Sequence, residues 1–268
     1  MERMPALLLL ALLAVSVLTA QVTRDAPAYS AATIVNAASN DPNALAPYTI
    51  IKINGTNLAW DAHAMQPSDV RNSMVPTVLP NTGVRVWINN QGAGILSVSP
   101  TQITALVPGD LAPGPGTLRV FLDAIVGPLV PINLSQFGPG VFANADGKLI
   151  AARENGDLVT ADAPLKPGDK MVLHAVGLGP GDPMLMGLEI PGSFVGLDGQ
   201  TTVAVYINHN PIDPALISDV SLVRGQPGVY QLTVQLPPDT PANPEIRIEA
   251  NGFKSPAGFT VLVSPGDS

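Results

Sequence analysis

Apolar and polar residues alternate along many short segments of this chain. Val84, Val86 and Ile88, for example, are separated by Arg85 and Trp87. A period of two predicts a strand with one buried face and one open face. Similar segments, short and bounded by Gly, Pro, Asn or Asp, predict further strands along the whole chain. The predicted strands are 48–54, 84–89, 95–98, 102–107, 117–123, 129–134, 148–153, 157–160, 170–176, 202–208, 217–223, 229–236, 245–250 and 259–263.

Turn residues separate these strands and leave little room for long helices. The chain holds 25 Gly and 28 Pro, which punctuate regular structure. Segment 108–116 is rich in both and predicts a turn. Asn155-Gly156 predicts a hairpin with a type I′ turn, which needs positive φ at both central residues. The polar segment 61–74 predicts a surface loop with room for one short helical turn.

Three of the predicted strands recur in the same order in the second half of the chain. Segment 48–58 matches 169–178, 84–90 matches 203–209, and 102–108 matches 231–237. The second copy is longer around 212–226, where a loop can absorb the extra residues. Many short strands without helical periodicity are typical of β-sandwiches. We therefore expect an all-β protein with two tandem β-sandwich domains, 21–137 and 138–268, divided near the Pro/Gly-rich segment 136–140.

The first twenty residues have the composition of a signal peptide. Arg3 precedes a short apolar run, and Ala20 offers a small residue at which cleavage can occur. The run is shorter than the roughly 20 apolar residues of a membrane span, although a retained N-terminal anchor is the alternative. We expect residues 1–20 to be removed, the mature chain to have no membrane span, and the protein to be secreted or held at the cell surface.

Charge and cysteine content narrow the class of partner. The formal net charge is −8, which repels polyphosphates, so nucleic acid and anionic membranes are poor partners. The chain contains no Cys. This excludes thiol catalysis, cysteine-ligated metals and disulfides, so each domain must rely on its own core.

Nine short pieces of sequence, taken in order, carry a family resemblance. They are IVNAAS at 34–39, LAP at 45–47, GTNL at 55–58, VPTVL at 75–79, VSPTQI at 98–103, PGVF at 139–142, PG at 167–168, GLG at 177–179 and GVYQL at 228–232. With these the chain resembles the uncharacterised Solibacter-type C-terminal domain of secreted acidobacterial proteins, from about residue 34 to 263. The resemblance implies tandem immunoglobulin-like units, similar to IPT/TIG domains. It implies no catalytic residue and no defined ligand.

No residue pattern indicates a reaction. His63, His174 and His209 stand apart, without a second ligand at a metal-binding spacing. Asn144-Ala-Asp-Gly147 does not fit an EF-hand loop, because Phe142 and Arg153 fall where carboxylates are required, and a polar turn is the simpler interpretation. The stretch 192–196 lacks the spacing of a nucleophile elbow. We therefore predict no catalytic residue, no metal, no cofactor and no enzymatic activity.

Two aromatic residues are the candidate binding residues. Trp87 and Tyr206 occupy matching places in the two copies, on the face opposite the buried stripe, where a ring can stack on a sugar or a partner. The alternative is that another strand, the 61–74 loop or the other domain covers them. The leading hypothesis is an exported non-enzymatic protein for adhesion, envelope structure or binding of an extracellular polymer, with an unknown extracellular or cell-surface protein or glycan as partner. A carbohydrate-binding module and a secreted hydrolase with an unrecognised site are the alternatives.

Overall fold

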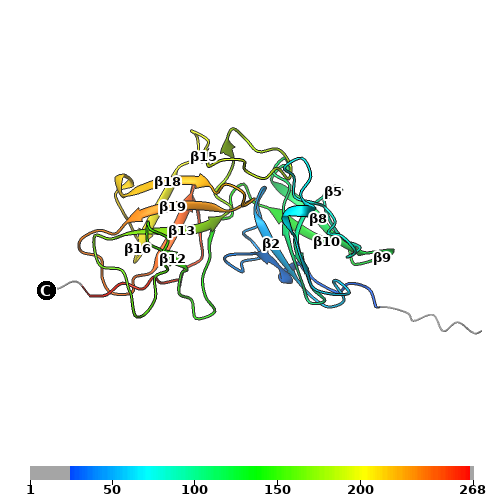
Figure 1. Ribbon diagram of the computed structural model, residues 1–268, viewed down its shortest axis with the longest axis horizontal. Helices are drawn as coiled ribbons and strands as arrows, with labels where there is room; N and C mark the ends of the chain where they lie inside the picture. The colour runs from blue at the N-terminus through cyan, green and yellow to red at the C-terminus, as the bar shows by residue number, and fades with distance from the viewer. Residues whose placement is uncertain (1–24, 266–268) are drawn as a thin grey trace, which may run out of the picture.

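The computed structural model describes residues 25–265 and shows an all-β protein (Figure 1). The helices among these residues are three single 3-10 turns, η1 (Ala31–Thr33), η2 (Pro67–Asp69) and η3 (Pro214–Leu216). None has the length and apolar character of a membrane span. The all-β prediction is confirmed, and the predicted signal peptide, 1–20, lies outside the described residues.

Two sheets form the N-terminal half. One has the strand order β1-β2-β7-β6-β3, and the other has the order β10-β8-β4-β5 with β9 paired to β8. The strands are β1 (Ile34–Asn36), β2 (Ile50–Asn54), β3 (His63–Ala64), β4 (Val84–Ile88), β5 (Gln91–Gly92), β6 (Gly94–Val98), β7 (Gln102–Leu106), β8 (Gly114–Leu122), β9 (Ile125–Val126) and β10 (Val130–Leu134). The predicted surface loop 61–74 carries β3 and the single turn η2.

Two further sheets form the C-terminal half. They have the orders β11-β13-β19-β18-β15-β14, with β12 paired to β13, and β17-β16-β20-β21. The strands are β11 (Gly140–Val141), β12 (Ala151–Ala152), β13 (Lys170–Val176), β14 (Gly181–Asp182), β15 (Val195–Leu197), β16 (Val203–Ile207), β17 (Asn210–Pro211), β18 (Ile217–Leu222), β19 (Tyr230–Gln235), β20 (Ile246–Ala250) and β21 (Phe253–Lys254).

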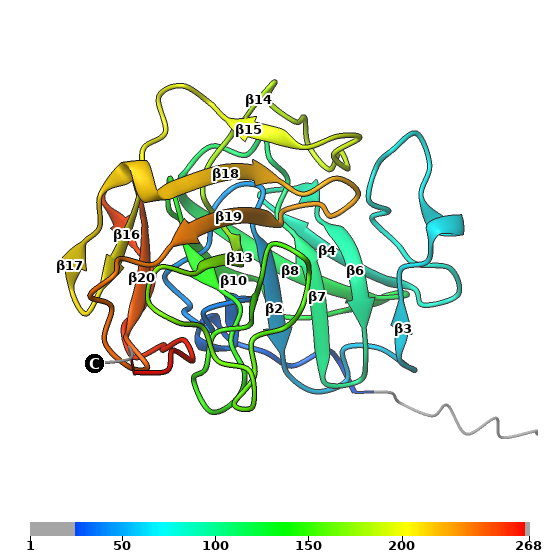
Figure 2. The ribbon, with the colours of Figure 1, turned by 60° about the vertical axis from the view of Figure 1, so that its left-hand side comes forward.

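The strand order of the first pair of sheets recurs in the second pair. In both halves the matching central strands, β2-β7-β6 and β13-β19-β18, are neighbours, and so are β8-β4-β5 and β20-β16-β17. The three sequence blocks that repeat are these same strands: β2 with β13, β4 with β16, and β7 with β19. Figure 2 shows β13, β19 and β18 side by side in one half, with β16 and β20 beside them. The extra residues of the second copy form η3 and the loop between β18 and β19.

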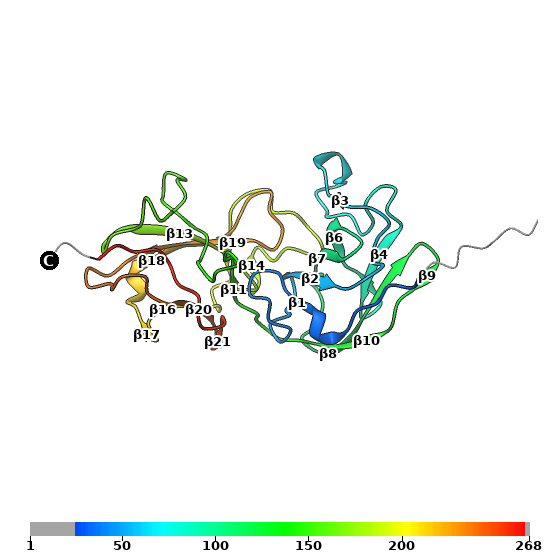
Figure 3. The same ribbon diagram turned by 90° about the horizontal axis from the view of Figure 1, so that it is seen from below.

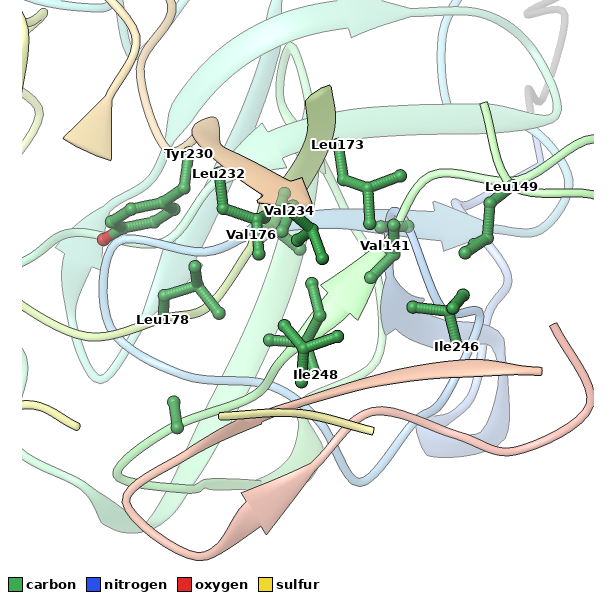
Figure 4. Packing of buried hydrophobic residues seen from close by; sticks show 14 of the residues in the cluster. Val141, Leu149, Leu173, Val176, Leu178, Tyr230, Leu232, Val234, Ile246 and Ile248 are labelled. Carbon is green, nitrogen blue, oxygen red and sulfur yellow. The ribbon is translucent and has the colours of Figure 1, made fainter. Parts of the chain in front are cut away.

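The alternating residues fill two buried clusters. In β4 the pattern is strictly buried–exposed, with Val84, Val86 and Ile88 fully buried. Figure 4 shows the second cluster, in which Leu173 of β13 and Leu232 of β19 face Ile248 of β20 across the layer between the two sheets. Burying such side chains stabilises each by about 1.5–3 kcal/mol, so this packing holds the protein together without disulfides.

Residues 137–140 of the Pro/Gly-rich segment 136–140 are buried, and the segment's backbone bonds to both halves. The Gly138 N donates to the Gly177 carbonyl (3.0 Å), and the Gly138 carbonyl accepts from Asn36 Nδ2 (2.9 Å). Asn36 is fully buried, and its Nδ2 also donates to the Ala44 carbonyl. Figure 3 shows β11, which begins at Gly140, the last residue of this segment, between β13 and β1. The connection is therefore packed and hydrogen-bonded along its length.

Direct contacts also join the two halves. Tyr48, Ile50 and Leu106 of the N-terminal half belong to the same buried cluster as the core of the C-terminal half. Backbone bonds run from Val75 N to the Leu188 carbonyl (2.9 Å), and from Gly109 N to the Gly187 carbonyl (2.7 Å). An apolar interface that also shares backbone bonds holds the halves in one arrangement.

Four local predictions differ from the structure. The predicted strand 157–160 is not formed, because Leu158 makes one isolated bridge, to Ala152. Segment 108–116 is not a turn throughout, because β8 starts at Gly114. At Pro115 the strand pairs with β10 but not with β4, so the missing N–H of the proline breaks no hydrogen bond to a second neighbouring strand. The type I′ turn is wrong, because only Gly156 has positive φ (+90°), while the Asn155 side chain accepts from Asp157 N (3.0 Å). Segment 259–263 forms isolated bridges with three different neighbours and no ladder.

Candidate functional site

Trp87 lies on an open sheet face. It is 43% exposed, at a position of β4 where alternation points the side chain away from the core. Its ring contacts that of Phe121 on β8, with centroids 5.8 Å apart and planes inclined at 58°. The two rings are not stacked flat, so they form an angled apolar surface. The expectation that another element covers Trp87 is not met among the described residues.

Two arginines complete this surface. The antiparallel register places Arg119 opposite Trp87 and Arg85 opposite Phe121. Residues directly opposite in a ladder have Cβ atoms about 4.5–5.5 Å apart. Arginine and aromatic ring therefore alternate around a small square on β4 and β8. We call Arg85, Trp87, Arg119 and Phe121 the Trp87 face.

The arginines have few partners within the protein. Arg85 Nη2 donates to the backbone carbonyl of Asp123 (2.8 Å), while the Asp123 carboxylate accepts from the Trp60 indole (2.8 Å). Arg119 Nε is buried and has no hydrogen-bond partner among the described residues. In the part of the chain that the structure describes, neither guanidinium forms an ion pair.

Tyr206 occupies the matching place in the second half, on β16, but its surroundings differ. Its hydroxyl donates to Glu249 Oε2 (2.9 Å), and Lys254 Nζ lies 3.9 Å from its ring centre. The same lysine pairs with Glu249 (3.4 Å). Tyr206 belongs to a different sheet from Trp87 and its ring is already engaged by the protein, so the two predicted binding residues do not form one site.

A cleft of about 250 Å³ lies where the two halves meet. Tyr48, Phe137 and Leu185 supply part of its apolar lining, and Gln200 and Asn251 supply amide groups. Clefts of this kind at an interface are common ligand sites. Among the described residues Asp198 is the one charged side chain that lines it, so it lacks the carboxylate pair of a glycosidase.

Buried tyrosines beside this cleft give a pH prediction. The hydroxyls of Tyr48 and Tyr230 donate to the carbonyls of Glu189 and Gly179, and burial is the main cause that raises the pKa of both phenols above the usual value. Because the folded pKa is raised, stability is complete below the unfolded value of about 10 and is lost as the pH rises above it. At about pH 11 each buried phenol is expected to lower the free energy of unfolding by roughly 1.4 kcal/mol.

The Tyr48→Phe variant isolates this effect. Free energies of unfolding in urea, measured at about pH 9 and about pH 11, should fall less steeply for the variant than for the parent, by roughly 1.4 kcal/mol. Tyrosinate absorbance of the folded parent at the higher pH supplies the control. If both buried phenols ionise there without unfolding, the prediction is wrong.

The remaining chemistry-bearing residues do not converge. Among residues 25–265 no three His, Cys, Asp or Glu side chains gather in a group that could hold a metal ion. His209 Nδ1 lies 3.3 Å from Glu245, while burial lowers the pKa of His174 on β13. Asn144–Gly147 forms a turn, in which Gly147 N donates to the Asn144 carbonyl (3.0 Å).

Comparison with known proteins gives only distant likenesses. No family model and no curated protein matches the chain. A surface glycan-binding protein from Prevotella bryantii is 12% identical, with 88% of this chain and 42% of that chain covered and a TM-score of 0.28. A Bacteroides ovatus protein of a mixed-linkage glucan utilization locus, in complex with a heptasaccharide, is 9% identical, with 83% and 43% covered and a TM-score of 0.34. Two domains of a surface-layer protein are 11% identical, with 89% and 99% covered and a TM-score of 0.27.

These likenesses are weak in two respects. The chain spans less than half the length of either glycan-related neighbour. The TM-scores are too low for any of these proteins to carry an argument about ligand or role. What this chain binds must therefore be argued from its own residues.

Proposed function

We propose that the protein is an exported, non-enzymatic binding protein that holds an extracellular glycan on the Trp87 face. The observation that carries the proposal is the Trp87–Phe121 ring pair, in which Trp87 lies open on a sheet face. Exposed aromatic rings offer a flat apolar surface to the C–H groups of a sugar ring. Tyr206 has no binding role in this proposal, because Lys254 occupies its ring.

The proposal includes two tandem immunoglobulin-like units, 21–137 and 138–268, of the Solibacter-type acidobacterial family. The recurring strand order supports the duplication, and the sequence pieces quoted above support the family. Location outside the cytoplasm or at the cell surface is supported by the signal-like residues 1–20. An adhesive or envelope role agrees with a binding face on a rigid, disulfide-free scaffold.

A secreted hydrolase is the competing function, and the cleft is the place where it would act. Hydrolysis of a glycoside commonly needs two carboxyl groups that flank the scissile bond. Asp198 is the one acidic side chain that lines the cleft among the described residues. Binding through ring faces needs no such pair, so the Trp87 face supports binding better than the cleft supports catalysis.

Replacing Trp87 with alanine tests the proposal. Truncation of a central aromatic side chain commonly costs at least about 2 kcal/mol of binding, or roughly thirtyfold in affinity. We expect Trp87→Ala to lose at least this much affinity for the glycan that the parent protein selects on a glycan array. Tyr206→Ala, at the matching position of the second half, should keep the parent affinity.

Two outcomes contradict the proposal. One is a parent protein that retains no glycan. The other is a Trp87→Ala variant whose affinity is unchanged for every glycan that the parent binds. Because Trp87 is exposed, the variant should keep the parent's thermal midpoint, which shows that a lost affinity does not come from a lost fold.

A further inference from the structure

We infer that the Trp87 face selects acidic glycans, those whose rings carry carboxylate or sulfate groups. The inference rests on the proposed function and adds the ligand class. The observation behind it is the pair of guanidinium groups that flank the two rings, Arg119 opposite Trp87 and Arg85 opposite Phe121.

Both arginines have hydrogen-bonding capacity that the protein does not use. The Arg119 side chain donates no hydrogen bond to a described residue, and its Nε is buried without a partner. The nearby Tyr29 hydroxyl is engaged elsewhere, because it donates to the Pro128 carbonyl (2.6 Å) and accepts from Val120 N (2.7 Å). Arg85 makes one bond, to a backbone carbonyl. Buried polar groups without partners are uncommon and need an explanation.

The Trp87 face is positively charged, although the chain as a whole is negatively charged. The sequence carries 13 Lys and Arg against 21 Asp and Glu, yet the Trp87 face holds two guanidiniums and no carboxylate. Asp123, beside Arg85, turns its carboxylate to the Trp60 indole. A local cationic site attracts an anionic group at short range even on an acidic protein, because salt screens the more distant charges.

The second half provides an internal comparison in the same register. There Ala204 and Tyr206 on β16 lie opposite Glu249 and Arg247 on β20. Glu249 accepts from Tyr206 and pairs with Lys254, and Arg247 Nε donates to the Ser255 carbonyl (2.8 Å). This face satisfies its own charges. The Trp87 face has Arg85 where the second half has Ala204, and Phe121 where it has Glu249, so its charges remain for a ligand.

A sugar acid fits these groups better than the other anionic polymers. A uronic acid ring presents an apolar C–H face next to a carboxylate, which matches an aromatic ring beside a guanidinium fork. An acidic peptide can pair with arginines, but its Asp and Glu side chains offer no ring face to lie against Trp87 and Phe121. A nucleic acid carries its charges on phosphates that are not part of the base rings, so a base stacked on Trp87 does not itself present an anionic group to the guanidiniums.

Polygalacturonate and its fully methyl-esterified form give the sharpest test, because they share one backbone and differ in charge. Affinity electrophoresis would compare the full-length parent, the double variant Arg85→Gln/Arg119→Gln, and the control Arg224→Gln, which removes an exposed arginine elsewhere. Sulfated chondroitin, poly-glutamate and single-stranded DNA complete the set of ligands.

We expect the parent to bind polygalacturonate or sulfated chondroitin at least about tenfold more tightly than the ester. The double variant should lose that difference and Arg224→Gln should keep it. Added salt should weaken binding of the acid form only.

Each other result overturns the inference. Equal affinity for the acid and ester forms, lost in Trp87→Ala, removes the acidic preference and leaves the proposed function intact. If the protein retains neither form and no other glycan, both the inference and the proposed function are wrong. Tighter binding of poly-glutamate or of DNA than of either acidic glycan assigns the face to a different macromolecule.

Discussion

Replacing Asn36 with alanine is expected to lower the free energy of unfolding by at least about 4 kcal/mol. The fully buried Asn36 side chain makes four hydrogen bonds to the backbone. Its Oδ1 accepts from Ala38 N (2.9 Å) and Ser39 N (3.0 Å). Its Nδ2 donates to the carbonyls of Ala44 (3.0 Å) and Gly138 (2.9 Å). Each buried backbone group that loses its partner costs roughly 1–3 kcal/mol, and alanine removes the partner of all four.

Two further variants separate this mechanism from a general loss of packing. Asn36→Asp keeps the two accepting contacts but turns a carboxylate oxygen toward two carbonyl oxygens, so we expect it to be at least as damaging as alanine. Asn133→Ala, on an exposed position of β10, should change stability by less than about 0.5 kcal/mol. Urea unfolding of the three variants gives the answer. A loss below about 1 kcal/mol in Asn36→Ala would show that water replaces the side chain at these four groups.

Most of the strands could be predicted from the sequence repeat and from the alternation of apolar and polar residues within each strand. Segment 170–176 coincides with β13, and 84–89 exceeds β4 by one residue, because strands with one buried face place apolar residues at every second position. Strands of two or three residues, such as β5 and β11, were not predicted, since a period of two cannot be recognised in so short a run. The exact conformation of the Asn155-Gly156 turn also depends on a side-chain bond that the dipeptide alone does not reveal.

The candidate site could be predicted only in part. Trp87 was found because it lies on the face opposite the buried stripe and matches Tyr206 in the second copy, but Arg119 and Phe121 were missed. Both alternate with buried residues in β8, so the signal for an outward direction is present in the sequence. What the sequence lacks is the register that places them opposite β4. That the Tyr206 ring is covered could not be predicted either, because Lys254, which lies over it, comes from a separate strand.

The burial of the connection between the two halves could not be predicted from its composition. A segment rich in Pro and Gly was predicted as a boundary without regular structure, which gave no reason to expect burial. The structure buries Phe137 and the residues that follow it. Here the glycines permit backbones to approach closely, so their role is packing rather than looseness.

Replacing Gly177 with alanine tests this packing role. Gly177 has φ +72°, and a Cβ added there would lie 2.0 Å from the Gly138 carbonyl oxygen. A backbone atom at that distance cannot rotate away, so the connection must move off β13. The positive φ adds about 1 kcal/mol of strain for a residue with a Cβ. With the clash included, we expect Gly177→Ala to lower the free energy of unfolding by roughly 4 kcal/mol.

Gly225→Ala is the matched control, because Gly225 has nearly the same φ (+75°) but no atom within 4 Å of an added Cβ. Gly225→Ala should lower the free energy of unfolding only by the strain of the positive φ, about 1 kcal/mol. The difference between the two variants in urea unfolding therefore measures the contact between Gly177 and the connection. Equal losses would mean that the connection shifts freely and that Asn36 anchors it only to the N-terminal half. A clearly larger loss for Gly177→Ala means that the close approach at Gly138 couples the unfolding of one half to that of the other.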